Sequence, residues 1–153
     1  MEKKEDCIFC KIVEGKVSCH KFYEDSKFLA FLDIFPNTRG QALIITKEHH
    51  GSDIFKMPTA EYSKLMQTTR KVTEILKKAL KVYRVGTIIE GMGVDHAHIK
   101  LYPMQGLDKE WQPVFSGDEK FYEKYPGFLT SATGPKARHE ELKELSEKIK
   151  NSL

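Results

Sequence analysis

Two histidines, a lysine and a tyrosine occupy every second position of the segment 95–102. Side chains of a β-strand point to opposite faces with a period of two residues. One accessible face of a strand is therefore predicted to carry His96, His98, Lys100 and Tyr102. The core-facing positions of this strand are predicted to be Ala97, Ile99 and Leu101. Imidazole is a nucleophile and proton carrier near neutral pH, and an ammonium group binds negative charge. The segment is therefore predicted to serve nucleophilic attack, proton transfer and anion binding.

A second group of reactive residues is the pair Cys7 and Cys10. The spacing C-x2-C is typical of a metal-binding knuckle. Two cysteines supply only half of a tetrahedral site, so the residues alone leave an alternative open, in which both are small, partly buried side chains.

The strand that carries the histidines needs partners, and the apolar patterns predict them. Alternating or continuous apolar runs predict strands within 20–34 (two strands around a polar turn at 24–27), 42–46, 85–90 and 95–104. Apolar residues at helical spacing predict a long helix over 59–83 and a C-terminal helix over 139–151. Strands gathered around one long helix indicate an α+β fold with a mostly antiparallel sheet of about five strands.

The length of 153 residues suits a single domain. We expect a core over 1–104, which ends with the histidine strand, and a C-terminal extension over 105–153. Residues 105–137 are rich in aromatic and turn residues and are predicted to be irregular, with a short helix near 118–125.

Composition excludes several classes of protein. The 25 basic and 22 acidic residues give a net charge of +3, too small and too scattered to predict a nucleic-acid-binding surface. No apolar stretch approaches the ~20 residues that span a membrane, and the polar residues 1–6 do not open a signal peptide. Three cysteines form a poor disulfide framework and suit a reducing compartment. We therefore expect a soluble cytoplasmic protein without a membrane or nucleic-acid partner.

The segment 96–102 resembles the histidine-triad signature, His-φ-His-φ-His-φ-φ with φ apolar, except that Lys100 stands at the third histidine. Other stretches resemble the same family in order and spacing. They are the opening segment of bacterial-type members at 6–15, the nucleoside-pocket stretches at 23–25 and 28–34, and the Lys-x-His element at 47–49. The chain is identified as a member of the histidine-triad (HIT) family over most of its length.

The resemblance implies that His98, the middle histidine, attacks the α-phosphorus of a bound nucleotide and forms a covalent nucleotidyl-histidine. His96 and Lys100 complete the catalytic set that it implies. A lysine does not relay protons as imidazole does near neutral pH, although its ammonium group neutralises phosphate charge. This departure from the signature leaves the leaving-group specificity and the rate open.

The resemblance also implies a nucleotide pocket. Asp33 corresponds to the residue that holds the ribose hydroxyls, and Ile34 packs on the base. Backbone N–H groups around Gly91 and Gly93 are predicted to cradle phosphate oxygens, because glycine permits a close approach. The alternative for Asp33 is that its carboxylate only caps the turn before Pro36.

By the same resemblance, a structural zinc ion is bound by Cys7, Cys10, His49 and His96. A zinc ion with four protein ligands is closed to substrate, and His98 keeps its lone pair for the reaction. His50 remains an alternative to His49, because adjacent strand residues point in opposite directions and only one of them reaches the metal.

The function implied is that of a nucleotide hydrolase or nucleotidyl transferase. Its substrates would be nucleoside phosphoramidates or dinucleoside polyphosphates, and the protein would be a homodimer. Two alternatives stay open on the residues. One is a nucleotide-binding module with little or no turnover, and the other is a zinc-stabilised interaction module whose histidines serve only the metal.

Overall fold

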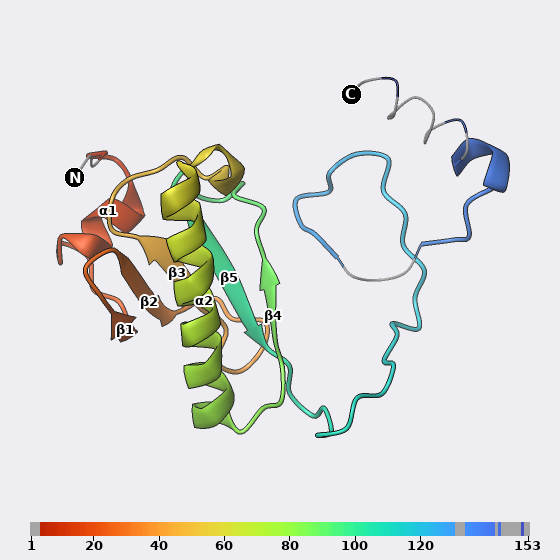
Figure 1. Ribbon diagram of the computed structural model, residues 1–153, viewed down its shortest axis with the longest axis horizontal. Helices are drawn as coiled ribbons and strands as arrows, with labels where there is room; N and C mark the ends of the chain where they lie inside the picture. The colour runs from red at the N-terminus through yellow and green to blue at the C-terminus, as the bar shows by residue number, and fades with distance from the viewer. Residues whose placement is uncertain (1–3, 131–133, 143, 145–150, 152–153) are drawn as a thin grey trace. The chain divides into compact units, whose positions relative to one another are not determined.

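The computed structural model describes residues 4–130, 134–142, 144 and 151 (Figure 1). The chain divides into two compact units, Met1–Trp111 and Gln112–Leu153. The predicted division into a core over 1–104 and an extension over 105–153 stays a prediction.

A five-stranded antiparallel sheet forms the centre of the first unit, in the order β1-β2-β3-β5-β4. The strands are β1 (Lys21–Glu24), β2 (Phe28–Leu32), β3 (Ala42–Thr46), β4 (Val85–Ile88) and β5 (His98–Pro103). The apolar run of β3 occupies the middle of the sheet, where a strand is buried on both faces. The predicted α+β class with an antiparallel sheet is confirmed.

Helices cover both faces of this sheet. Alternate residues of β2 and β3 point to opposite faces, so Ala30 and Ile44 belong to one apolar cluster and Leu29 and Ile45 to the other. Helix α2 (Thr59–Leu80) packs on the first face through Leu65, Val72 and Leu76. Helix α1 (Ile8–Val13) covers the second face through Phe9 and Cys10 (Figure 1).

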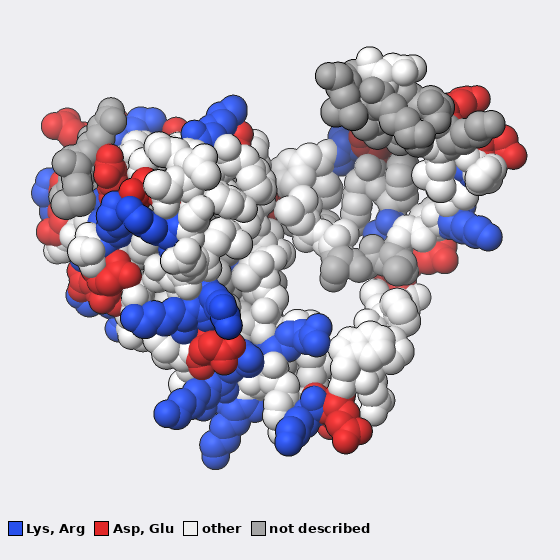
Figure 2. Space-filling model, viewed as in Figure 1, with Lys and Arg blue, Asp and Glu red and all other residues white. Residues whose placement is uncertain are grey.

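Helix α2 ends three residues before the predicted end at 83. Lys81 adopts a left-handed conformation (φ 54°), which cannot continue a right-handed helix. Lys77 and Lys78 lie in the last turn, where the helix dipole favours positive charge. Figure 2 shows basic side chains gathered over this end of the helix.

The histidine strand is shorter than predicted. β5 begins at His98 rather than at residue 95, because the chain turns before it and the N–H of His96 donates to the carbonyl of Val94 (2.8 Å). The N–H of Ala97 donates to the carbonyl of His50 (2.8 Å), which ties the loop after β3 to the start of β5. None of the helices in the described part of the chain is long and apolar enough to cross a membrane.

The second unit is largely irregular, as predicted for residues 105–137. The short helix predicted near 118–125 is wrong, because these residues form bends and irregular chain. A helix this short needs tertiary packing, and the ring of Phe121 is instead 75% exposed. Residues 139–142 and 144 are helical, in agreement with the predicted C-terminal helix, and most of the rest of that helix lies outside the described residues.

Candidate metal centre and active-site strand

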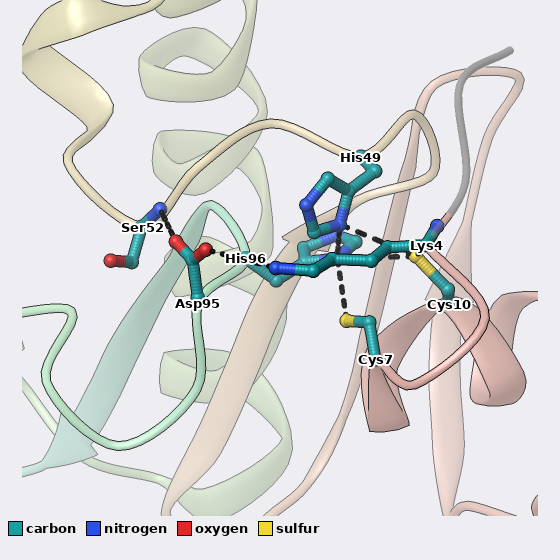
Figure 3. A network of polar contacts seen from close by, with 7 residues as sticks. All are labelled: Lys4, Cys7, Cys10, His49, Ser52, Asp95 and His96. Atoms are coloured by element: carbon teal, nitrogen blue, oxygen red, sulfur yellow. Dashed lines mark hydrogen bonds and ion pairs between the residues drawn. The ribbon is translucent and has the colours of Figure 1, made fainter.

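Four side chains converge at the face of the sheet that α1 covers. The Sγ atoms of Cys7 and Cys10 and one ring nitrogen each of His49 and His96 all lie within 4.8 Å of one another (Figure 3). Cys7 is the N-cap of α1, and Cys10 lies one turn later, so the first turn of the helix presents both thiols. His49 comes from the loop after β3, and His96 lies two residues before the start of β5.

Hydrogen bonds to Thr46, on the side of the ring opposite the thiols, fix the orientation of His96. Its Nε2 lies 2.8 Å from the carbonyl oxygen of Thr46 and 3.2 Å from the Thr46 hydroxyl, which itself donates to the carbonyl of Glu48 (2.6 Å). Both Thr46 oxygens therefore accept, so Nε2 carries the proton and Nδ1 points its lone pair at the thiols. Complete burial lowers the pKa of His96 to about 4, which keeps the ring neutral.

The distances fit a tetrahedral ion. Bond lengths typical of zinc place two ligand nitrogens about 3.4 Å apart and a nitrogen and a sulfur about 3.6 Å apart. The two Nδ1 atoms of His49 and His96 are 3.2 Å apart. The nitrogen–sulfur separations are 3.3 Å (Cys7 to His96), 3.4 Å (Cys10 to His49) and 3.7 Å (Cys10 to His96). The four residues are therefore able to hold a metal ion, and it is His49 rather than His50 that lies in this group.

A polar network supports the group from outside. The backbone N–H of Lys4 points at Cys10 Sγ (3.5 Å), and its ammonium group pairs with Asp95 (3.5 Å). The other Asp95 oxygen accepts the N–H of Ser52 (3.0 Å), as Figure 3 shows. The segment before α1, the loop after β3 and the approach to β5 are thus tied together. Sequence reasoning missed these three residues, since long-range contacts of single polar residues leave no pattern in the sequence.

His98 is held in one tautomer. Its Nδ1 lies 2.6 Å from the carbonyl oxygen of His96, which only accepts, so Nδ1 carries the proton and Nε2 keeps its lone pair. The Phe9 ring and the imidazole pack edge-to-face, with ring centroids 5.3 Å apart. Burial lowers the pKa of His98, so the neutral imidazole is favoured.

The predicted accessible face is wrong for the two histidines. His96 is 0% and His98 is 4% exposed, because the face they occupy is the one that α1 covers. His98 and Lys100 do share this face, since they pair with Ile45 and Leu43 of β3. Only the end of the row at Lys100 and Tyr102 is partly exposed.

Lys100 is bound to an acidic partner that the sequence did not reveal. Its Nζ lies 3.0 Å from Oε1 of Glu90, and the two side chains are 27% and 10% exposed. Burial lowers the pKa of Lys100, but the hydrogen bond and the charge of Glu90 raise it by more, so the net shift is upward. The register of the sheet brings the two residues together, because Ile88 of β4 pairs with Lys100 and Glu90 follows two residues later.

The predicted nucleotide-binding residues lie on loops of the same unit. The Asp33 carboxylate accepts the N–H of Phe35 (2.8 Å) and the side-chain amide of Gln41 (2.7 Å), so the turn-capping role expected as an alternative is present. Ile34 is 71% exposed. Gly91 has a φ of +69°, and a Cβ there would lie 2.8 Å from the Ser52 carbonyl oxygen, whereas a Cβ at Gly93 would meet nothing within 4 Å.

Several known proteins are similar to this chain in sequence or in structure. An uncharacterised HIT-like protein of Methanocaldococcus jannaschii is 33% identical over 108 residues, which cover 68% of this chain and 83% of that protein. An adenosine 5'-monophosphoramidase of Candida albicans is 32% identical over 124 residues (72% and 81%). The crystal structure of a Streptococcus mutans protein, SMU.412c, superposes with a TM-score of 0.69 at 32% identity over 98% of this chain and 87% of that one.

The family model of the HIT domain matches residues 14–105, more than half of the chain. The matched region contains the whole sheet, helix α2, His49, His96, His98 and Lys100. The chain belongs to the HIT domain family.

Proposed function

We propose that this protein is a nucleotide hydrolase or nucleotidyl transferase that acts at the α-phosphate through a covalent nucleotidyl-His98. The observation that carries the proposal is the hydrogen bond from His98 Nδ1 to the carbonyl of His96. It directs the free lone pair of a neutral imidazole to Nε2. Membership of the HIT family and the likeness to an adenosine 5'-monophosphoramidase support the nucleotide as the substrate.

The reaction runs in two displacements. His98 Nε2 forms a bond to the α-phosphorus while the bond from phosphorus to the leaving group breaks and its electron pair departs with that group. Water or another acceptor then attacks the same phosphorus and gives up a proton to the solvent. The bond from phosphorus to Nε2 breaks, and Nε2 leaves with its lone pair restored. Splitting one displacement into two lowers each barrier.

The nucleoside is held by the residues that the sequence predicted. Asp33 uses one lone pair on each oxygen within its turn, and a carboxylate offers about four acceptor sites, so it is still able to accept the ribose hydroxyls. The exposed Ile34 side chain supplies an apolar surface for the base. Gly91 and Gly93 bring backbone N–H groups to the phosphate oxygens, with Gly93 the less crowded of the two.

Cys7, Cys10, His49 and His96 would hold a zinc ion. With four protein ligands such an ion has no open position for substrate and serves the structure. His96 links this site to the reaction, because its Nδ1 faces the thiols and its carbonyl orients His98. The homodimer and the cytoplasmic location stay predictions.

Steady-state turnover tests the proposal, with adenosine 5'-phosphoramidate and diadenosine tetraphosphate as substrates. His98→Ala is expected to abolish activity, and the control His20→Ala, at an exposed position, to leave it within about twofold. Calorimetric nucleotide binding without turnover in the wild type would indicate the binding module instead. Loss of bound metal from His98→Ala would indicate that the histidines serve only the metal.

A further inference from the structure

We infer that Lys100 and Glu90 together select nucleotides whose leaving group departs as a stable anion without taking up a proton. Such substrates are mixed anhydrides of a nucleoside monophosphate with sulfate or with phosphate, in preference to phosphoramidates. Lys100 contacts the leaving group, and Glu90 is a positioning residue for Lys100. The inference rests on the proposed reaction at His98.

The register of the sheet places Lys100 beside the nucleophile. His98 and Lys100 are two residues apart on one face of β5, which corresponds to about 6.6 Å along the strand. The lysine side chain is long enough to reach a group bonded to a phosphorus atom at His98 Nε2. The Lys100 side chain is also partly exposed, whereas His98 is buried, so Lys100 borders the open part of this face.

Glu90 fixes the direction of the ammonium group. The contact of 3.0 Å uses one of the three N–H donors of Lys100 and leaves two for substrate oxygens. Glu90 is only 10% exposed, so the pair is shielded from solvent on the carboxylate side. An ammonium group held in place in this way stabilises charge that develops on a leaving oxygen without reorganising.

The protonated side chains on this face are poor acids. Lys100 keeps its proton at neutral pH because Glu90 outweighs the effect of burial on its pKa. Burial raises the pKa of Tyr102, and although the charge of Lys100 lowers it, the net shift is upward. Both side chains therefore donate hydrogen bonds, but they do not release a proton to a leaving group.

Leaving groups differ in whether they need that proton. When His98 Nε2 attacks a nucleoside phosphosulfate, the P–O bond breaks and sulfate departs with the electron pair as a dianion. When it attacks a phosphoramidate, the P–N bond breaks, and the nitrogen must take up a proton to leave as ammonia rather than as an amide ion. Proton donation by a positioned side chain accelerates a reaction by about 10²–10⁴-fold. Cleavage of a phosphoramidate would lack this acceleration here.

The test compares kcat/KM for adenosine 5'-phosphosulfate, diadenosine tetraphosphate and adenosine 5'-phosphoramidate. We expect the wild type to favour one or both anhydrides over the phosphoramidate by about 100-fold or more, the lower bound for a missing general acid. Lys100→His supplies an imidazole and is expected to shift this ratio toward the phosphoramidate by at least about tenfold, whereas Lys100→Arg retains the charge and the wild-type preference.

The role of Glu90 has its own comparison. Glu90→Gln is expected to lower kcat on the preferred anhydride by about tenfold, and Glu90→Asp to restore part of it, because a carboxylate still directs the ammonium group. Glu61→Gln is the matched control, since Glu61 also pairs with a lysine (Lys27, 2.7 Å) but on helix α2. It is expected to stay within about twofold. Thermal melts verify that each variant is folded.

The outcomes separate the two proposals. A wild type that forms an adduct at His98 but hydrolyses the phosphoramidate as fast as the anhydrides overturns this inference and leaves the proposed function intact. Lys100→His with an unchanged ratio also overturns it, as does a folded Glu90→Gln with unchanged kcat. Absence of turnover and of any adduct with all three substrates overturns the proposed function itself.

Discussion

Replacing Phe9 with alanine probes how helix α1 encloses the two histidines. The ring is 7% exposed and packs edge-on against Phe31, His96 and His98, with centroids 6.0, 5.7 and 5.3 Å away. Truncation of a buried phenylalanine destabilises a protein by about 3–5 kcal/mol. Helix α1 is only six residues long and can relax into the space, so we expect the lower end, about 3 kcal/mol.

Urea unfolding followed by circular dichroism measures this loss, and a thermal melt should show a midpoint lower by about 10 °C. Phe55→Ala is the control, because that ring is 73% exposed and its removal should change the free energy of unfolding by less than about 0.5 kcal/mol. A loss below about 1 kcal/mol for Phe9→Ala would refute the packing of α1 on the histidine face.

Three further predictions concern the metal group, a glycine and a turn. Cys10→Ser should reduce bound zinc, measured by mass spectrometry of the purified protein, and should lower the melting temperature, whereas Cys19→Ser, outside the group, should do neither. Gly91→Ala should lower the free energy of unfolding by about 1–3 kcal/mol in urea titrations, because the φ of Gly91 is +69° and the new Cβ would meet the backbone of Ser52. An unchanged free energy of unfolding would contradict this geometry. Burial raises the pKa of Asp25, but hydrogen bonds from two backbone N–H groups and the Tyr23 hydroxyl lower it below 3.8 overall. The ionised Asp25 carboxylate therefore stabilises the fold above pH 3.8, and this stabilisation is lost as the pH falls through the pKa of the folded state. Asp25→Asn should be less stable than the wild type by about 1–2 kcal/mol at pH 7. The difference in the free energy of unfolding should shrink in acid.

Much of the fold was predictable because its signals are local. The apolar run 42–46 predicted the central strand, and the helical spacing from residue 59 predicted α2. The end of α2 was not predictable from the apolar residues at helical spacing. This pattern continues to Val82, whereas the backbone of Lys81 adopts the left-handed conformation that ends the helix. The helix predicted near 118–125 does not form, because a weak local pattern gives no helix without tertiary packing.

The candidate site was predictable in its residue types but not in its burial. Strand alternation placed His98 and Lys100 on one face, and the register confirms that. Whether α1 covers that face depends on a long-range contact between Phe9 and β5, which alternation does not encode. The same holds for Glu90, whose pairing with Lys100 depends on how β4 and β5 align.

Intact-mass spectrometry after rapid mixing with a nucleotide substrate tests the central claim most directly. The wild type is expected to gain one nucleotidyl group that decays as product forms, because His98 Nε2 is the free ring nitrogen. His98→Ala should show neither the adduct nor turnover, and its zinc content should equal that of the wild type. An adduct that persists in folded His98→Ala, or undiminished turnover in that variant, would contradict the assignment of His98 as the nucleophile.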